Sequence, residues 1–234
     1  MSAHLASVTD RFSPALHGFA AAGDWNRPQP RAAWDRELPQ AGVLRHFRQD
    51  QEICGDGGKA DYFFKVVSGT VRTCKFLDDG RRHVEAFHTA GDVFGYELGE
   101  DYSHSAEAVS DCTVLSFHRR SCDSVSDANR PLQSQIFAAV MESLKRAQRH
   151  NMLLGCKTAI EKVAAFLLDW AGPAGAARCV DLTMTRQDMG DYLGLTIETV
   201  SRMLSQLERQ GLIELESPRH IKLKNAAALA ELKI

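Results

Sequence analysis

The sequence has no long apolar run and no secretory pattern at its N-terminus. Its apolar stretches fall well short of the roughly 18 residues that cross a membrane, and Ala20–Ala22 is too short for the core of a signal peptide. We therefore expect a cytoplasmic protein with no membrane partner. At 234 residues, the chain is long enough for two modest domains.

Paired cysteines and the usual catalytic patterns are also missing. The six cysteines are dispersed, with no Cys-x-x-Cys pair, and in a reducing compartment such cysteines are mostly small buried hydrophobic residues. The chain has no phosphate-binding glycine loop, Ser/His/Asp motif or spaced set of metal ligands, so we expect neither an enzyme nor a bound cofactor. One cysteine is a candidate redox thiol: Cys179 follows the Gly-Pro-Ala-Gly segment at 172–175 and precedes the motif described below.

The chain also lacks a strong net charge. Its 28 Lys and Arg residues against 30 Asp and Glu residues leave a formal charge of −2 at pH 7. Attraction to nucleic-acid phosphates depends on where cations gather rather than on their total. The charge balance therefore excludes a general basic coat and leaves a local DNA-binding patch open.

A series of short strands is present between residues 41 and 125. Strands of this length, separated by Gly and Asp turns, predict an antiparallel β-roll, a shape that often holds a small ligand. A turn is expected at Asp78–Arg81. The expected strand regions are 62–69, 70–77, 82–88, 91–95, 106–110 and 113–117. Residues 1–40 are irregular and predict an N-terminal arm with one short helix at 11–22.

A long helix is predicted over residues 126–155, capped by Ser126 or Asp127. One stripe on it recurs at intervals of three and four residues for more than five turns, which is typical of a helix packed along a partner. The alternative is a helix that lies on the core of its own domain. The expected dimer interface consists of Ile136, Val140, Ser143, Ala147 and Leu154, with His150 in the same stripe.

The C-terminal domain is expected at residues 156–234 and begins with a helix at Ala159–Trp170. A helix-turn-helix follows within residues 182–209. Thr185 is a good N-cap for its first helix, with Asp188 closing a capping box. Gly194 permits the left-handed backbone of a tight turn between helices.

The second helix of this motif has one apolar and one polar face. Thr196 caps it with Thr199 at its third position, and the inward residues are expected to be Val200, Leu204 and Leu207. Its outer face presents Glu198, Ser201 and Arg202 as a recognition helix presents side chains to the major groove. Arg can donate two bonds to guanine, Glu can accept from cytosine N4, and the two residues stand one turn apart.

A hairpin at residues 211–223 completes the motif as a wing, with Arg219 and Lys222 as cations for phosphates. The alternative is a helical hairpin with a solvated polar face. A lone helix–Gly–helix is weak evidence, but the turn, the polar face and the basic wing together favour DNA binding. The residues expected at the DNA are Thr185, Arg186, Thr196, Ile197, Glu198, Thr199, Ser201, Arg202 and Arg219.

In this order of β-roll, long helix and winged helix-turn-helix, the chain resembles the Crp/Fnr superfamily of dimeric transcription regulators over residues 40–225. The stretch 182–204 is most similar to the Fnr and FixK branches. The resemblance implies an α+β fold with a cyclic-nucleotide-binding-like roll, a homodimer and RNA polymerase as a partner. It also implies TTGA-N6-TCAA-like palindromes read by Glu198, Ser201 and Arg202, with Ile197 against a thymine methyl group.

The resemblance also bears on the effector. Cyclic-nucleotide binders of the superfamily grip the phosphate with an Arg, whose place is taken here by His104. A neutral His is a poor substitute for a permanently charged fork, so we do not expect cyclic AMP.

Fnr proper holds a [4Fe–4S] cluster through N-terminal cysteines and a central one that Cys112 resembles, but residues 1–53 contain no cysteine. The cluster-free FixK-like branch, which controls microaerobic, respiratory or nitrogen-fixation genes, is the better match. The alternative within the superfamily is a sensor that uses an iron–sulfur cluster or heme, with His83, His88, His104 and His118 in or near the roll.

Overall fold

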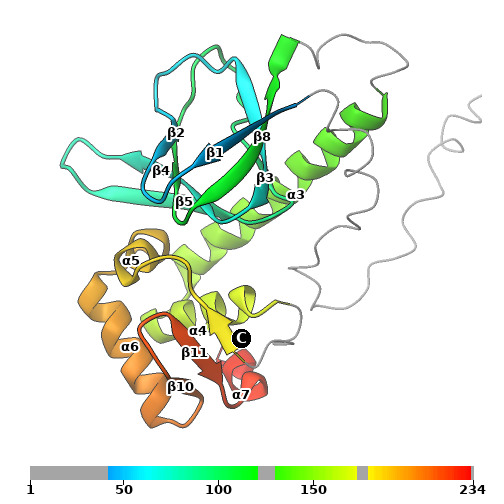
Figure 1. Ribbon diagram of the computed structural model, residues 1–234. Coiled ribbons are helices and arrows are strands. Elements are labelled where there is room, and N and C mark those ends of the chain that lie inside the picture. The colour runs from blue at the N-terminus through cyan, green and yellow to red at the C-terminus, as the bar shows by residue number, and fades with distance from the viewer. Residues whose placement is uncertain (1–41, 121–129, 173–178, 233–234) are drawn as a thin grey trace, which may run out of the picture.

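The computed structural model of the chain describes residues 42–120, 130–172 and 179–232. The expected arm at 1–40 and the expected caps Ser126 and Asp127 lie outside the described residues. Figure 1 shows a β-roll above, a long helix α3 running along it, and a second unit of helices with a small sheet below. None of the described helices is both long and apolar enough to cross a membrane.

The β-roll consists of two four-stranded antiparallel sheets, with strand orders β1-β8-β3-β6 and β2-β7-β4-β5. The expected strands are all present, and β1 and β2 are additional. The sequence of β1, Val-Leu-Arg-His-Phe, has no alternation of polar and apolar residues that would predict a strand, and its Val43 and Leu44 are exposed. The strands are β1 Val43–Phe47, β2 Glu52–Cys54, β3 Tyr62–Ser68, β4 Val71–Phe76, β5 Arg82–His88, β6 Val93–Phe94, β7 Ser105–Ala108 and β8 Cys112–His118.

The hairpin between β4 and β5 turns where the sequence predicts. Gly80 has φ 83°, and the Gly80 N–H donates to the Leu77 carbonyl over 2.9 Å. Between the sheets, Phe64 stacks on Phe94 at 5.2 Å between ring centroids, in a buried cluster that includes Val71 and Ala106 of the other sheet. This packing gives the roll a core of its own and a rigid surface for other elements.

The second unit is the α+β winged helix-turn-helix that the sequence predicts. Helix α4 has the predicted bounds and begins where the Glu161 carboxylate accepts the Thr158 backbone N–H over 2.7 Å. Strand β9 joins the hairpin in a sheet of order β10-β11-β9. The elements are α4 Ala159–Trp170, β9 Cys179–Asp181, α5 Arg186–Leu193, α6 Ile197–Arg209, β10 Ile213–Leu215, β11 His220–Leu223 and α7 Ala226–Glu231.

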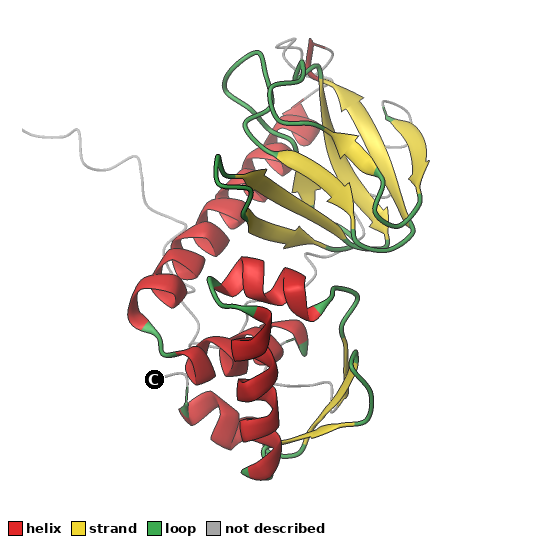
Figure 2. Ribbon diagram, turned by 90° about the vertical axis from the view of Figure 1, so that its left-hand side faces the viewer, coloured by secondary structure: helices red, strands yellow, loops and turns green. Residues whose placement is uncertain are grey.

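Helix α3, Arg130–Cys156, links the two units, as Figure 2 shows from the side. Part of the stripe expected to form the dimer seam faces the chain's own roll. Ile136 packs against the cluster of Phe63 and Phe117, and His150 is buried. The stripe residues Val140, Ser143, Ala147 and His150 line a cavity of the roll, and Leu154 lies beside Gly194.

The dimer interface expected at Ile136, Val140, Ser143, Ala147 and Leu154 stays a prediction. Helical periodicity predicts a packed face without saying which partner covers it. Within this chain the roll covers Ile136, while Val140 and Ala147 are exposed. Helix α3 carries a second stripe, spaced four and three residues apart, in which Phe137 is 67% and Leu144 48% exposed. We call these residues the outer stripe of α3: Phe137, Met141, Leu144, Gln148, Asn151 and Gly155, all exposed.

Candidate DNA-binding site

The first helix of the motif, α5, is fixed by its N-cap. The Asp188 backbone N–H donates to Thr185 Oγ1 over 3.1 Å, and Asp188 Oδ2 accepts the Thr185 backbone N–H over 2.9 Å. The predicted capping box is therefore present, with Asp in place of the usual Glu. Because Met189 and Leu193 are fully buried, the cap holds the helix in one register against the core.

The turn between α5 and α6 depends on two glycines. Gly194 adopts the left-handed conformation at φ 64°, as predicted. Gly190 allows a close approach, since a Cβ there would lie 2.6 Å from the Leu195 carbonyl oxygen. That carbonyl belongs to the segment that starts α6, so the absence of a side chain at position 190 sets the angle between the helices.

Helix α6 is amphipathic in the predicted sense. Thr196 Oγ1 accepts the Thr199 backbone N–H over 3.3 Å and starts the helix. The inward residues Val200, Leu204 and Leu207 are fully buried. On the outer face, Thr196, Ile197, Glu198 and Arg202 are exposed, and Thr199 and Ser201 are half-buried.

Polar contacts preorganise this outer face. Arg202 donates from Nη2 to the Thr199 hydroxyl over 3.0 Å, and Arg186 donates from Nη1 to the Ser201 hydroxyl over 3.2 Å. Hydrogen bonds from its own backbone N–H and from the Thr196 hydroxyl, with the charge of Arg202, lower the pKa of Glu198. The face therefore offers an ionised acceptor beside an Arg fork, and Arg202 is oriented by Thr199.

The wing is less basic than its sequence predicts. Arg219 is exposed at its tip, but Lys222 lies opposite Glu214 in the strand register, with 3.7 Å between Lys222 Nζ and a Glu214 carboxylate oxygen. Lys224 Nζ lies 3.5 Å from the same carboxylate oxygen. Cross-strand pairing of this kind depends on register, which the sequence alone did not reveal. Arg219 is therefore the wing cation best placed for a phosphate.

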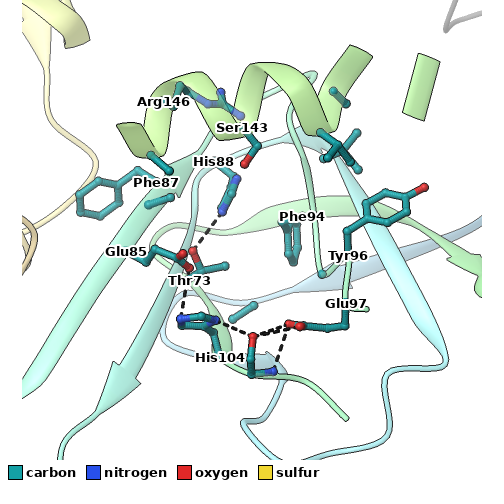
Figure 3. A pocket seen from close by; sticks show the side chains of 18 of the residues that line it. Thr73, Glu85, Phe87, His88, Phe94, Tyr96, Glu97, His104, Ser143 and Arg146 are labelled. Atoms are coloured by element: carbon teal, nitrogen blue, oxygen red, sulfur yellow. Dashed lines mark hydrogen bonds and ion pairs between the residues drawn. The ribbon is translucent and has the colours of Figure 1, made fainter. Parts of the chain in front are cut away.

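A cavity of about 360 Å³ lies between the roll and α3 (Figure 3). Glu97 Oε1 accepts both the backbone N–H of Ser103, over 3.0 Å, and its hydroxyl, over 2.9 Å. His104 Nδ1 lies 2.9 Å from that hydroxyl, and its Nε2 lies 3.4 Å from Glu85 Oε2. A carboxylate at each end of this chain of contacts disfavours an anion such as a cyclic phosphate.

Comparison with known proteins places this geometry in a family. Residues 44–129 match a model described as a cyclic nucleotide-binding domain, and residues 161–232 match a Crp-like helix-turn-helix domain. The nitrogen fixation regulation protein FixK of Azorhizobium caulinodans is 46% identical over 229 residues, which cover 96% of this chain and 90% of that protein. The chain belongs to the FixK-like branch of the Crp/Fnr family.

Other members of the Crp/Fnr family support the same placement. The transcriptional activatory protein AadR of Rhodopseudomonas palustris is 42% identical, with 85% of this chain and 83% of that protein covered. The structure of FixK2 from Bradyrhizobium japonicum superposes with a TM-score of 0.77 at 41% identity, covering 83% of this chain and 98% of that one. The chain is thus a transcription regulator of FixK type with a helix-turn-helix DNA-binding domain, and the relatives named here are regulators rather than enzymes.

The histidines of the roll, which the heme alternative takes as candidate ligands, have different surroundings. His88 is buried, lies 3.2 Å from the Thr73 hydroxyl, and burial lowers its pKa to about 4. His118 meets Tyr62 edge to face, and the ring of His83 lies 6.3 Å from that of His150. Among the described residues, no group of three or more His, Cys, Asp or Glu side chains is arranged to hold a metal ion.

The cysteines of this Crp/Fnr chain differ in exposure. Cys112, which resembles the central cluster ligand of Fnr, is buried, and desolvation raises the pKa of its thiol to about 11. Cys179 is exposed at the start of β9, and Cys156 is exposed at the end of α3. A redox role for Cys179 stays a prediction.

Proposed function

We propose that the chain acts as a homodimeric transcription activator that binds TTGA-N6-TCAA-like palindromes and recruits RNA polymerase. The genes under its control would be microaerobic, respiratory or nitrogen-fixation genes; its relative from Azorhizobium caulinodans is named a nitrogen fixation regulation protein. A regulator of this kind works in the cytoplasm, where the DNA is. The observation that carries the proposal is the outer face of α6, with exposed Glu198 and Arg202 beside Ser201.

The chemistry of this face suits the proposed half-site. Arg202 can donate to guanine O6 and N7, and the ionised Glu198 can accept from the amino group of cytosine, so the G·C pair of TTGA is read from both strands. Ile197, exposed at the start of α6, offers an apolar contact to a thymine methyl group. Thr185, Arg186, Thr196 and Thr199 surround the face, and Arg219 extends it toward the backbone.

The outer stripe of α3 supports the homodimer. Its members recur at four, three, four, three and four residues, which is the heptad seam of a two-stranded coiled coil. Phe137, Met141 and Leu144 supply the apolar part, and Gln148 and Asn151 are polar positions that can fix the register of two parallel helices. A twofold axis along this stripe matches the palindrome, because a symmetric dimer reads two inverted half-sites.

Gel-shift titration at physiological salt tests the proposal. The unchanged protein is expected to bind a duplex with TTGA-N6-TCAA at least about 1,000-fold more tightly than a scrambled duplex of equal length, which is the low end for specific regulators. Equal affinity for both duplexes would refute the proposed function.

Arg202→Ala is expected to weaken binding to the palindrome by about 1–3 kcal/mol per half-site and to relax the preference at the G·C pair. The physical reason is the loss of a bidentate donor at one base. The measurement is the affinity for the palindrome and for variants changed at that pair. Arg209→Ala is the matched control, because Arg209 is exposed at the other end of α6 and lies outside the expected DNA contacts. An equal loss on every sequence would show that Arg202 contacts phosphate instead.

A further inference from the structure

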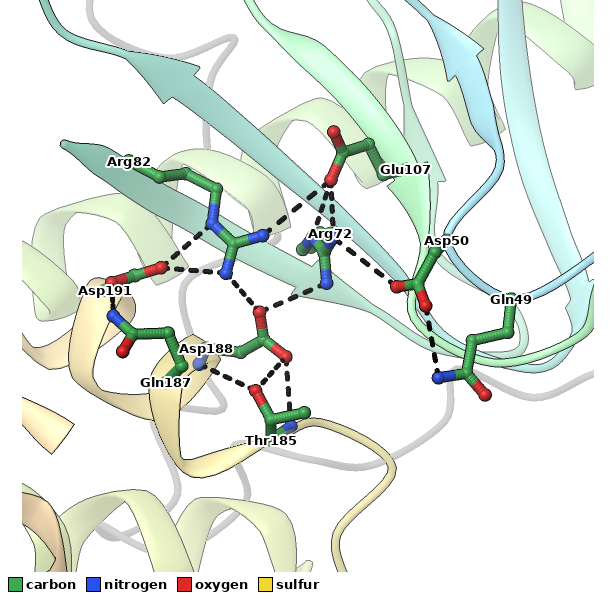
Figure 4. A network of polar contacts seen from close by, with 9 residues as sticks. All are labelled: Gln49, Asp50, Arg72, Arg82, Glu107, Thr185, Gln187, Asp188 and Asp191. Atoms are coloured by element: carbon green, nitrogen blue, oxygen red, sulfur yellow. Dashed lines mark hydrogen bonds and ion pairs between the residues drawn. The ribbon is translucent and has the colours of Figure 1, made fainter. Parts of the chain in front are cut away.

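An ion-pair network joins the roll to the first helix of the DNA-binding motif (Figure 4). From β5, Arg82 contacts Asp188 over 2.5 Å and Asp191 over 2.8 Å, in each case from Nη2. From β4, Arg72 Nη1 contacts the same Asp188 oxygen over 3.1 Å, and its Nη2 lies 2.6 Å from Glu107 on β7. Two arginines of one domain thus converge on two carboxylates of α5.

The network is enclosed rather than superficial. Asp188 is 2% and Arg72 7% exposed, so salt screens their attraction much less than that of a surface pair. Asp188 uses its two oxygens for two purposes: Oδ1 meets the arginines, and Oδ2 accepts from Thr185. The residue that caps α5 therefore also ties it to the roll.

Apolar contacts surround the network and hold the same helix. Tyr192 of α5 stacks on His150 of α3 at 4.0 Å, and its ring lies 5.3 Å from that of Phe87 on β5. Thr183, just before α5, donates its hydroxyl to that of Thr70 over 3.0 Å. Helix α5 is thus held from the roll and from α3, while the outer face of α6 is left open.

We propose that Arg72 and Arg82 are positioning residues that set the spacing between the two half-sites which the protein accepts. The inference rests on the proposed function, because it assumes a homodimer on a palindrome. Helix α3 carries both the outer stripe and the face that packs on the roll. Fixing α5 to the roll therefore fixes each recognition helix at one distance and one angle from the twofold axis.

DNA makes such a fixed distance selective. One base pair more or less between the half-sites moves them by about 3.4 Å and turns them by about 35° around the duplex axis. A dimer with firmly held motifs meets only one spacing without strain. A dimer whose DNA-binding motifs move freely loses conformational entropy when it binds the matched site, which weakens that complex, but it can adapt to sites with other spacings.

The test measures affinities for TTGA and TCAA separated by five, six and seven base pairs. The unchanged protein is expected to prefer six by about 100-fold, and Arg82→Gln to reduce that preference at least tenfold. Arg81→Gln is the matched control, because Arg81 is exposed and pairs with Asp79 outside the network. Asp191→Asn, which also removes a contact of Arg82, should shift the preference in the same direction, and the two changes together should be less than additive.

A second readout does not depend on the palindrome. Amide hydrogen exchange in α5 of the full chain is expected to become at least tenfold faster in Arg82→Gln and to stay unchanged in Arg81→Gln. The proposal is overturned if Arg82→Gln leaves either the spacing preference or the exchange rate of α5 unchanged. It is also overturned if Arg82→Gln binds the palindrome more tightly than the unchanged protein, because the network would then hold an arrangement that does not bind DNA. If the unchanged protein shows no preference for the palindrome, the proposed function fails. The anchoring of α5 is judged separately, because it is overturned only if amide exchange in α5 is the same in Arg82→Gln as in the unchanged protein.

Discussion

Leu144→Glu is expected to make the protein monomeric and to weaken its binding to the palindrome at least about 100-fold. Linking two binding modules raises affinity by about that factor or more, and a monomer loses the gain. Leu144 lies in the middle of the outer stripe of α3 and is half exposed in the single chain. In the proposed dimer it would meet its twofold copy. Two Glu side chains there would bring like charges into a dry seam, which costs far more than the lost apolar contact.

Light scattering coupled to gel filtration measures the mass, and gel shift measures the affinity. Leu98→Glu is the matched control, since Leu98 is fully exposed in a loop of the roll and receives the same change of shape and charge. A Leu144→Glu protein that stays dimeric would remove the outer stripe from the dimer interface. A monomer that binds the palindrome as tightly as the unchanged protein would remove the homodimer from the binding mechanism.

Gly190→Val is expected to destabilise the C-terminal unit by about 2 kcal/mol or more, in the range of overpacked cores, and to abolish specific DNA binding. The Cβ alone would lie 2.6 Å from the Leu195 carbonyl oxygen. The obstacle is backbone and cannot rotate away, so α6 must shift relative to α5. The polar face of α6 would then leave its position even in molecules that stay folded.

Thermal denaturation followed by circular dichroism gives the stability, and gel shift gives the binding. Gly99→Val is the control, because the nearest atom to a Cβ there is 4.0 Å away. The dimer should survive in Gly190→Val, as the outer stripe of α3 is untouched. Normal stability with normal affinity would mean that the turn accommodates a side chain, and the steric argument for Gly190 would be wrong.

Local signals in the sequence were sufficient for much of the DNA-binding unit. The capping box of Thr185, the left-handed turn at Gly194 and the buried side of α6 each depend on residues within a few positions of one another. The wing hairpin and most strands of the roll follow in the same way. Family resemblance added the order of the units and their joint fold.

The features that sequence reasoning missed depend on contacts between distant residues. Helix α3 has two stripes, and only the fold decides that Ile136 packs against the roll while Phe137 is exposed. The pairing of Lys222 with Glu214 depends on strand register. Arg72 and Asp188 are 116 positions apart, so nothing in either local sequence indicates that they meet.

The pairing of the wing lysines has a consequence for how the regulator searches a genome. Lys222 and Lys224 each lie within 4 Å of Glu214, so we expect them to displace fewer condensed counterions at a duplex than two unpaired lysines would. Counterion release is the main source of affinity for unrelated DNA. We therefore expect the wing to add little affinity for unrelated DNA, which leaves the choice of site mostly to the bases that α6 contacts.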